Sequence, residues 1–231
     1  MKLSGILLIT MLLGILNGYA DKGNKKLTRE GYKLDTVSEK DLLKWKAFGQ
    51  GIKAINHGQL IISEKQGSKG YMLVSPASYN KDVVMSFDVM SLNPATVLIV
   101  EMFASNKNGG QLEFPEGYDG NLKFLFNELD MYMIAFHNAA HNKPGPFIRK
   151  FPEPGMEPLA MAKKHALNTG VFHRVELERK GNIIWLKVDG KKKVVATDSG
   201  QLLAGKMILR IRGTAQEHAS CIIRNMQIYS N

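Results

Sequence analysis

The sequence predicts an all-β fold in which two antiparallel sheets stack face to face as a sandwich. Alternating apolar and polar residues recur along the chain, whereas no segment keeps a helical period over about twelve residues. Tight-turn sequences separate these alternating runs, as antiparallel strands require. The 231 residues are 44% hydrophobic and include one cysteine, so they suit a single domain with its own core and exclude a disulfide-stapled miniprotein.

The first 20 residues have the pattern of a secretory signal peptide. Lys2 precedes an apolar run over residues 6–16, which ends in the small-residue stretch Gly18-Tyr19-Ala20. The run is shorter than the roughly 20 residues of a membrane-crossing helix, and no lipoprotein cysteine follows it. We expect a secreted or periplasmic protein without membrane insertion, with an uncleaved anchor as the alternative. Residues 21–36 then form a polar leader and residues 37–231 the sandwich domain.

Ten segments have the alternation of strands and are bounded by Gly, Pro, Asn or Asp. They are residues 59–64, 71–75, 82–90, 96–103, 131–137, 171–179, 183–188, 193–197, 206–212 and 221–229. The clearest unit is a three-strand meander over residues 171–197, whose turns contain Gly181-Asn182 and Asp189-Gly190. One short helical turn is expected where Ser38 and Asp41 have capping-box spacing. Two long segments, 105–121 and 138–170, do not alternate and are expected to border the binding site.

The charge balance favours an acidic partner. Lysine and arginine number 31 against 21 acidic residues, which gives a formal charge of +10. A positive field concentrates polyanions, and an exported protein meets acidic polysaccharides rather than a genome. Nucleic acid is disfavoured because no basic helix, zinc spacing or aromatic RNA-binding motif is present. Spare surface lysines are the alternative explanation, as in Lys191–193.

Glu101 is the first candidate catalytic residue. It lies within the apolar run Val-Leu-Ile-Val-Glu-Met-Phe, where a carboxylate needs solvent, a partner or a shifted pKa. A place in a cleft satisfies that need. A place on the solvated face of a half-buried strand satisfies it equally well.

Polar residues gather where the strand 131–137 runs into the proline-rich segment. His137 and Arg149 are the candidate catalytic residues there, and Asn138, His141 and Lys150 the candidate substrate-binding residues. A guanidinium binds planar oxyanions in a fork, and histidine transfers protons near neutral pH. The His-x-x-x-His spacing lacks the glutamate of a zinc protease, so no metal and no cofactor is expected. Histidines and asparagines that merely satisfy a turn are the alternative.

Two strand aromatics complete the candidate site. Trp185 and Tyr132 offer flat rings on which a sugar ring can stack, although core packing is the commoner fate of such residues. Trp185 shares its face with Lys187, which must reach water, so this face is expected to be open. His173 shares a face with Val175 and is expected at the edge of the core. Cys221 lies in a strand-like run and is expected to be packed rather than nucleophilic.

A family resemblance follows from these motifs. Residues 172–190 and the closing strand 223–229 resemble concanavalin A-like lectin/glucanase sandwiches. Residues 142–145 (Asn-Lys-Pro-Gly) and 149–152 (Arg-Lys-Phe-Pro), followed by Gly155, resemble the YesU-like family of uncharacterised bacterial proteins encoded among polysaccharide-utilisation genes. The resemblance covers the chain from about Trp45 onward. It implies a jelly-roll sandwich with a concave sheet that faces carbohydrate, and it implies no reaction.

We therefore expect a protein that acts on or binds a polysaccharide or oligosaccharide, preferably an acidic one. Hydrolysis would need a second carboxylate facing Glu101. Uronate elimination would use Arg149 and Asn138 on the sugar carboxylate and His137 as the base. A non-catalytic glycan-binding module and an envelope structural protein are the alternatives. Glu101, His137 and Arg149 are expected to line one cleft with Trp185 or Tyr132. The sugar, the oligomeric state and any structural calcium stay open.

Overall fold

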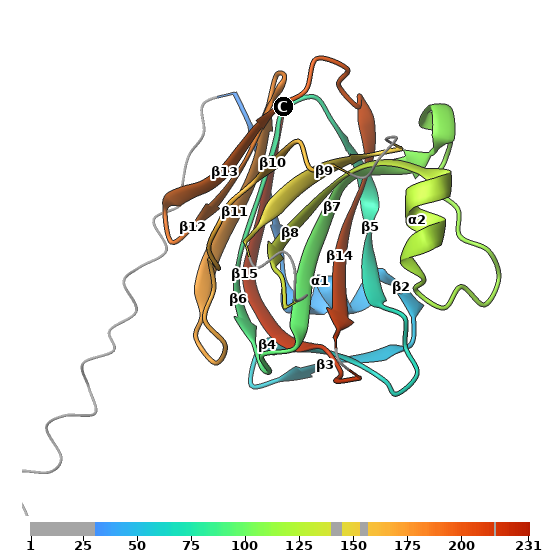
Figure 1. Cartoon of the computed structure of the whole chain (residues 1–231), viewed down its shortest axis with the longest axis vertical. Helices are drawn as coiled ribbons and strands as arrows, with labels where there is room; N and C mark the ends of the chain where they lie inside the picture. The colour runs from blue at the N-terminus through green and yellow to red at the C-terminus, as the bar shows by residue number, and fades with distance from the viewer. Residues whose placement is uncertain (1–30, 140–144, 153–156, 215) are drawn as a thin grey trace, which may run out of the picture. The chain divides into compact units, whose positions relative to one another are not determined.

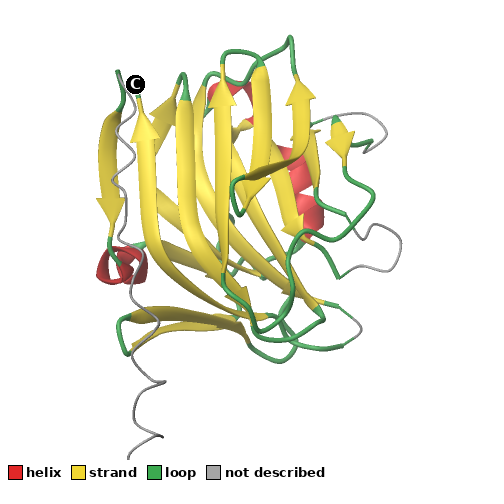
Figure 2. Cartoon of the chain, turned by 90° about the vertical axis from the view of Figure 1, so that its left-hand side faces the viewer, coloured by secondary structure: helices red, strands yellow, loops and turns green. Residues whose placement is uncertain are grey.

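The structure is a computed structural model that describes residues 31–139, 145–152, 157–214 and 216–231. Two antiparallel sheets stack face to face within these residues (Figures 1 and 2), which confirms the predicted sandwich. The expected signal peptide, the leader as far as residue 30, and His141 lie outside the described residues. No helix in the described part of the chain is long and apolar enough to cross a membrane.

Sheet A has the strand order β13-β12-β11-β6-β15-β4-β3, with β1 paired to β15, and every pairing is antiparallel. Its strands are β1 (Lys33–Val37), β3 (Gly51–Asn56), β4 (Gln59–Glu64), β6 (Val83–Ser91), β11 (His173–Lys180), β12 (Ile183–Val188), β13 (Lys191–Thr197) and β15 (Ser220–Ser230). The domain therefore begins at Lys33, inside the expected leader.

Sheet B has the strand order β10-β9-β8-β7-β14-β5-β2, again antiparallel throughout. Its strands are β2 (Lys46–Gly49), β5 (Tyr71–Asn80), β7 (Thr96–Asn106), β8 (Leu129–His137), β9 (Phe147–Phe151), β10 (Ala160–Met161) and β14 (Ala204–Gly213). All ten predicted strands are present. The five unpredicted strands, β1, β2, β3, β9 and β10, are short and have weaker alternation.

Within the described residues, three short helical elements accompany the sheets. Helix α1 (Glu39–Lys44) begins at the predicted capping box, in which the Ser38 side chain accepts from the Asp41 N–H. Helix α2 (Leu122–Glu128) was not predicted, and η1 (Lys107–Gly109) is a single 3₁₀ turn. Asn121 caps α2 by accepting from the Lys123 N–H at 2.9 Å.

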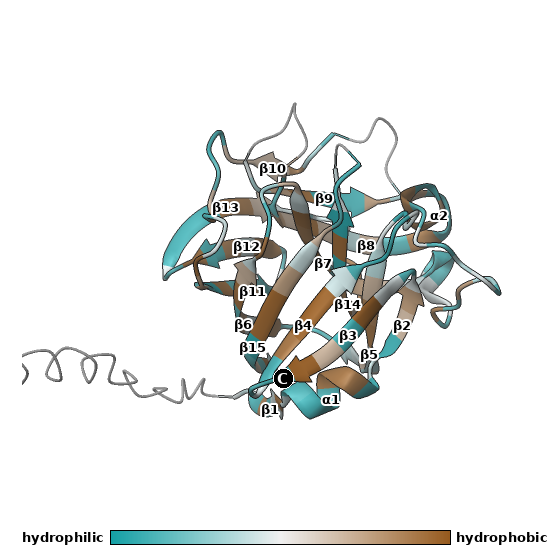
Figure 3. Cartoon of the chain, turned by 90° about the horizontal axis from the view of Figure 1, so that it is seen from below, coloured by the Kyte–Doolittle hydropathy of each residue, from teal (hydrophilic) through white to brown (hydrophobic). Residues whose placement is uncertain are grey.

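The main core lies between the sheets and draws side chains from both. Phe87, Val175 and Leu177 of sheet A and Val100 and Ile134 of sheet B are fully buried in it. The colouring of Figure 3 shows hydrophobic residues along the strands of both sheets. Alternation leaves every second side chain of each strand on the outer face of its sheet, so the two outer faces hold the remaining chemistry.

A second apolar cluster lies on the outer face of sheet B. It includes Met72, Ile99, Met133 and Ile208 of the sheet, together with Leu125 of α2. Figure 1 shows α2 on the side of the molecule away from β12 and β13. Helix α2 and the segment 112–118 thus cover part of this outer face and leave the rest of it without that cover.

Candidate functional site

One row of side chains crosses the outer face of sheet B. The strand register pairs Glu101 with Ile208 on one side and with Met133 on the other, and Met133 pairs in turn with Arg149. Val100 and Met102, which flank Glu101, point into the main core, so Glu101 points outward. Glu101 and Arg149 therefore share a face and a row.

His137 lies at the end of β8, where a bulge interrupts the alternation. Ala135 pairs with Ile99 of the outer cluster, but the register shift between Leu98 and Ile99 places His137 opposite Leu98, whose side chain lies in the main core. Cross-strand partners share a face, so His137 lies on the inner side of sheet B. The sheet thus presents Glu101 and Arg149 on its outer face, and the expectation that His137 lines the same cleft was wrong because the bulge turns its side chain to the other side.

Glu101 is completely buried, and neither of its carboxylate oxygens accepts a hydrogen bond from a described residue. Burial raises the pKa of Glu101 to about 7, although the guanidinium of Arg210 acts in the opposite direction. Neither expected environment, an open cleft or a solvated strand face, describes this position. The carboxyl lies beneath the apolar cover of the sheet, where its neutral form is favoured.

Arg210 is the cation that lowers the pKa of Glu101, and its side chain is also buried. Its Nη2 donates to the carbonyls of Lys69 and Gly120, both at 3.0 Å, while its Nε has no partner among described residues. Burial lowers the pKa of Arg210 and the Glu101 carboxyl raises it. This arginine was not among the predicted residues. The sequence feature that could have identified Arg210 is a charged residue within the apolar run 207–211 of β14.

Gly70 allows the chain to approach Arg210. A Cβ at Gly70, which has φ +137°, would lie 2.4 Å from Nη2 of Arg210. Gly120 (φ +85°) comes close to the same backbone, since a Cβ there would lie 2.0 Å from the carbonyl oxygen of Gly70. Both positions need glycine for space and for backbone conformation.

Arg149 is 8% exposed and makes no hydrogen bond or ion pair with any described residue. Its guanidinium lies over the Phe147 ring, with Cζ 4.9 Å from the ring centroid. Burial lowers the pKa of Arg149, and Glu157 partly opposes that effect. A guanidinium with this little solvent and no anionic contact has most of its donors available to a ligand.

His137 is 7% exposed, and neither ring nitrogen has a partner among described residues. Burial lowers the pKa of His137 to about 4, and His165 and His173 add to the effect. His173 is satisfied instead. Its Nδ1 lies 2.7 Å from Oδ2 of Asp189, and its Nε2 accepts from the Asn168 N–H, which confirms the expected core-edge position.

Glu101 and Arg149 share the outer face of sheet B, whereas His137 lies beside Leu98 at the end of β8. Two strand spacings separate Glu101 from Arg149, or about 10 Å between Cα atoms. Four residues along β8 separate His137 from the row of Arg149, or about 13 Å. No hydrogen bond or ion pair joins any two of the three. In the described part of the chain, no three histidine, cysteine or acidic residues are grouped as a metal site.

Tyr132 and Lys150 lie on the opposite side of sheet B from this face, so placing them in the same site was wrong. Tyr132 is packed in the main core, and its hydroxyl donates to Asp198 at 2.6 Å. Lys150, its cross-strand neighbour, forms an ion pair with Asp198 at 2.9 Å. The reason is the period of two in a strand, which sends Lys150 to the face opposite Arg149.

Trp185 belongs to sheet A, so it does not line the same surface as Arg149 and the expectation of a shared cleft was wrong here too. It lies in β12 on the outer face, partly exposed, as the neighbouring Lys187 predicted. Asn138 follows β8, is 5% exposed and is engaged in a polar contact. Cys221 is buried, which matches its predicted structural role.

Aromatic rings cover the part of the outer face next to Glu101. Phe114 lies 4.2 Å from Phe48 and 5.1 Å from Tyr118 between ring centroids, and Tyr118 lies 5.1 Å from Phe124. The Tyr118 hydroxyl donates to the Asn121 carbonyl at 2.7 Å. The segment 105–121 thus meets the sheet as predicted, but as an apolar cover.

A cavity of about 330 Å³ opens where this segment meets the ends of β5 and β14. Its lining is mainly small residues, with Lys206 as the charged one. Nζ of Lys206 donates to the Pro76 carbonyl, which holds this side chain at the backbone of β5.

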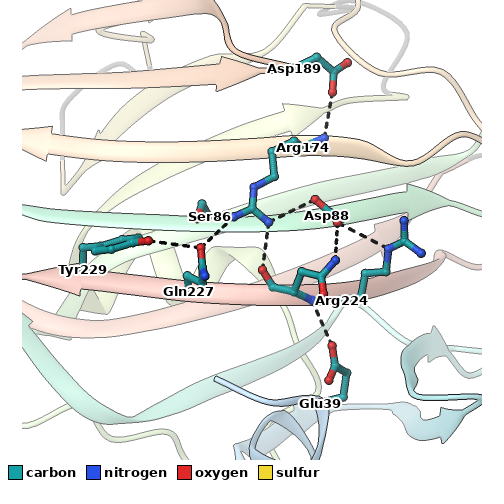
Figure 4. A network of polar contacts seen from close by, with 9 residues as sticks. Glu39, Ser86, Asp88, Arg174, Asp189, Arg224, Gln227 and Tyr229 are labelled. Carbon is teal, nitrogen blue, oxygen red and sulfur yellow. Dashed lines mark hydrogen bonds and ion pairs between the residues drawn. The ribbon is translucent and has the colours of Figure 1, made fainter. Parts of the chain in front are cut away.

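On the outer face of sheet A, in contrast, charged side chains contact one another, as Figure 4 shows. Arg174 donates to Asp88 at 3.2 Å, to Ser86 at 2.8 Å and to Gln227 at 3.3 Å. Arg224 lies 3.5 Å from the other carboxylate oxygen of Asp88. These groups satisfy one another across β11, β6 and β15.

The comparisons with known proteins agree with this fold. No family model and no curated protein matches the chain. A Bacillus subtilis protein of unknown function with a galectin-like fold is similar at a TM-score of 0.73 and 15% identity, covering 86% of this chain and 98% of that one. The carbohydrate binding module CBM66 from Bacillus subtilis is similar at 0.51 and 16%, covering 84% and 94%. The Emp47p carbohydrate recognition domain is similar at 0.55 and 11%, covering 81% and 88%.

At these identities the likeness shows the fold. The chain is an all-β sandwich of the galectin-like and concanavalin A-like kind, and proteins with carbohydrate-binding names share that architecture. The fold implied by the resemblance to the YesU-like family is confirmed.

Proposed function

We propose that the chain is an exported glycan-binding protein of a polysaccharide-utilisation system, and that the outer face of sheet B holds an acidic polysaccharide. The observation that carries the proposal is Arg149, a guanidinium that is only 8% exposed and has no anionic partner among described residues. A buried cation without a partner is costly, and a ligand carboxylate or sulfate would relieve that cost. The formal charge of +10 would attract such a polyanion.

The aromatic side chain beside Arg149 supports a sugar ligand. Phe147 contacts the guanidinium and is 7% exposed, whereas Met133 and Ala135 of the same face are 2% and 0% exposed and offer no surface. The exposed part of Phe147 would pack against the apolar side of a pyranose while the guanidinium binds the carboxylate.

Binding is favoured over catalysis because the carboxyl chemistry is incomplete. Hydrolysis needs a second carboxyl group about 5 to 10 Å from the first, with both reaching the substrate. Glu101 is fully buried, and the charge that acts most on it belongs to Arg210. Uronate elimination needs its base beside the carboxylate clamp, whereas His137 lies about 13 Å along the strand from the row of Arg149.

The test is the affinity of the Arg149→Ala variant for oligogalacturonate and for a neutral oligosaccharide of equal length, measured by calorimetry. Loss of a charge-assisted hydrogen bond is worth about 1.5 to 3 kcal/mol, so acidic binding should weaken about ten- to a hundredfold. The exposed Lys123→Ala variant removes the same charge from α2 and is the matched control. Equal weakening in both variants would reduce the effect to general attraction, and unchanged acidic binding would refute the proposal.

A further inference from the structure

Trp185 lies on the outer face of sheet A and is surrounded there by exposed apolar side chains. The strand register pairs Trp185 with Val195, which is 47% exposed, and the next outward residue of β12, Ile183, is 37% exposed. On its other side Trp185 pairs with Glu178 of β11. Antiparallel pairing on both sides of β12 forms this face, with a bulge between Leu186 and Lys187 one residue beyond Trp185.

Two lysines approach the ring from the neighbouring row. Nζ of Lys192 lies 4.8 Å from the centroid of the Trp185 ring, and Nζ of Lys187 lies 5.7 Å from it. Lys187 also forms an ion pair with Glu176 at 2.6 Å. Lys192 is exposed and forms no ion pair with a described residue. It is therefore an exposed cation next to an aromatic surface.

This patch differs from the rest of the same face. Arg174, Asp88 and Arg224 pair their charges with one another (Figure 4), whereas Trp185, Val195 and Lys192 belong to no such network of described residues. The patch is also separate from Arg149. The two sheets of a sandwich pack about 10 Å apart, and the outer faces point in opposite directions, so one short oligosaccharide cannot span both.

We propose that Trp185 and Lys192 form a second acidic-glycan surface, on the opposite sheet from Arg149. A pyranose ring stacks on the indole, and Lys192 moves from the ring to pair with a carboxylate or sulfate of the sugar. Lysine on a four-carbon stem makes that movement easily. The inference rests on the proposed function for the class of ligand, but it uses none of the residues on sheet B. With both faces in use, one molecule would bridge two polysaccharide chains.

The two tryptophans of the chain provide a direct test. Trp45 is 3% exposed in the core, so acrylamide quenching of tryptophan fluorescence reports mainly on Trp185. Polygalacturonate and dextran sulfate are the acidic probes, and dextran is the neutral one. We expect an acidic probe to lower the quenching constant about twofold in the wild type and equally in Arg149→Ala. In Trp185→Phe the probe should leave the quenching constant unchanged.

The variants separate the second surface from the first. Lys192→Ala should weaken the protection of Trp185 about two- to fivefold in probe concentration, on the scale of one exposed ion pair. Calorimetric binding at sheet B should stay unchanged in Lys192→Ala and weaken in Arg149→Ala. Trp185→Ala and Arg149→Ala should each abolish the light scattering that long polygalacturonate produces with the wild type.

Four results would overturn the second surface. They are an unchanged quenching constant with both acidic probes, equal protection by dextran, loss of protection in Arg149→Ala, and quenching that falls with protein concentration alone. The last would assign the patch to contact between copies of the chain. Failure of the proposed function itself would look different, because Arg149→Ala would then bind acidic oligosaccharides normally by calorimetry.

Discussion

The outer faces of the two sheets pair their charged side chains differently. On sheet A, Arg174 and Asp88 join hydrogen bonds and ion pairs that run across three strands (Figure 4). On sheet B, Arg149 and Glu101 are more deeply buried and lack partners among described residues. A charge that is paired within the fold stabilises it. An unpaired buried charge is costly, so the group becomes neutral through a shift in its pKa or is paired by a ligand.

Glu101 provides the largest expected effect on stability. Its folded pKa of about 7 lies above its ordinary value of 4.5, so its contribution is fully present below pH 4.5 and is lost as pH rises through about 7. The loss approaches about 3 kcal/mol in the free energy of unfolding. Urea unfolding at pH 5 and pH 9 measures it. Glu101→Gln stays neutral and should lack this loss.

Exposed Glu113 is the matched control for Glu101. Glu113→Gln should follow the pH dependence of the wild type. If Glu101→Gln also follows it, Glu101 is already ionised in the fold, and the assignment of an unpaired neutral carboxyl to sheet B fails.

His137 should act in the opposite pH direction. Its folded pKa of about 4 lies below its ordinary 6.5, so its contribution is present above pH 6.5 and is lost as pH falls toward 4. We expect about 2 kcal/mol, reduced from the full shift because the ring has slight contact with solvent. His137→Leu should lack this component in urea unfolding between pH 7 and pH 4.5. The exposed His218→Gln variant should retain it, and equal slopes in all three proteins would contradict the burial of His137.

Arg174 tests the paired face. Arg174→Ala removes donors to Asp88, Ser86 and Gln227, and we expect a loss of about 1 to 2 kcal/mol because the side chain keeps some solvent contact. Arg174→Lys should recover only part of it, since an ammonium cannot reproduce the fork. Thermal unfolding measures the stability, and calorimetry with oligogalacturonate should show unchanged affinity. Weakened binding in Arg174→Ala would break the division between a structural and a ligand-binding face.

Lys69 should give the smallest effect. It pairs with Asp119 at 2.8 Å, but the two side chains are 56% and 40% exposed. Such a pair contributes less than about 1 kcal/mol, and the contribution should shrink further in high salt. Chemical unfolding of Lys69→Ala at low and high salt checks this. A loss as large as that of Arg174→Ala would show that the cover over Arg210 depends on this ion pair.

The candidate site was predicted unevenly, for reasons that depend on distance along the chain. Alternation placed Glu101 in an apolar strand and left Arg149 within the long segment 138–170, but the order of strands within a sheet is not encoded locally. Tyr132 and Trp185 were therefore grouped with Arg149 although one lies in the core and the other on sheet A. Helix α2 was missed because seven residues are too few for a helical period.

Arg210 illustrates the same limit. Its strand was predicted, yet its burial depends on Gly70 and Gly120, which lie far from it in the sequence and bring their backbone over the guanidinium. The local pattern shows that a charged residue in an apolar strand needs polar partners. It does not show which segment of the chain supplies those partners.

Residues close together in the chain set the ten main strands, the capped turn at Ser38 and the three-strand meander, so the local pattern was enough to predict them, and the prevalence of alternation was enough to indicate a sandwich. Which charges are paired depends on the tertiary structure. Arg174 and Asp88 are 86 residues apart and meet because β11 lies beside β6, whereas Arg149 meets no carboxylate among described residues. Strand order sets these pairings, and strand order results from the packing of the whole domain rather than from any local pattern.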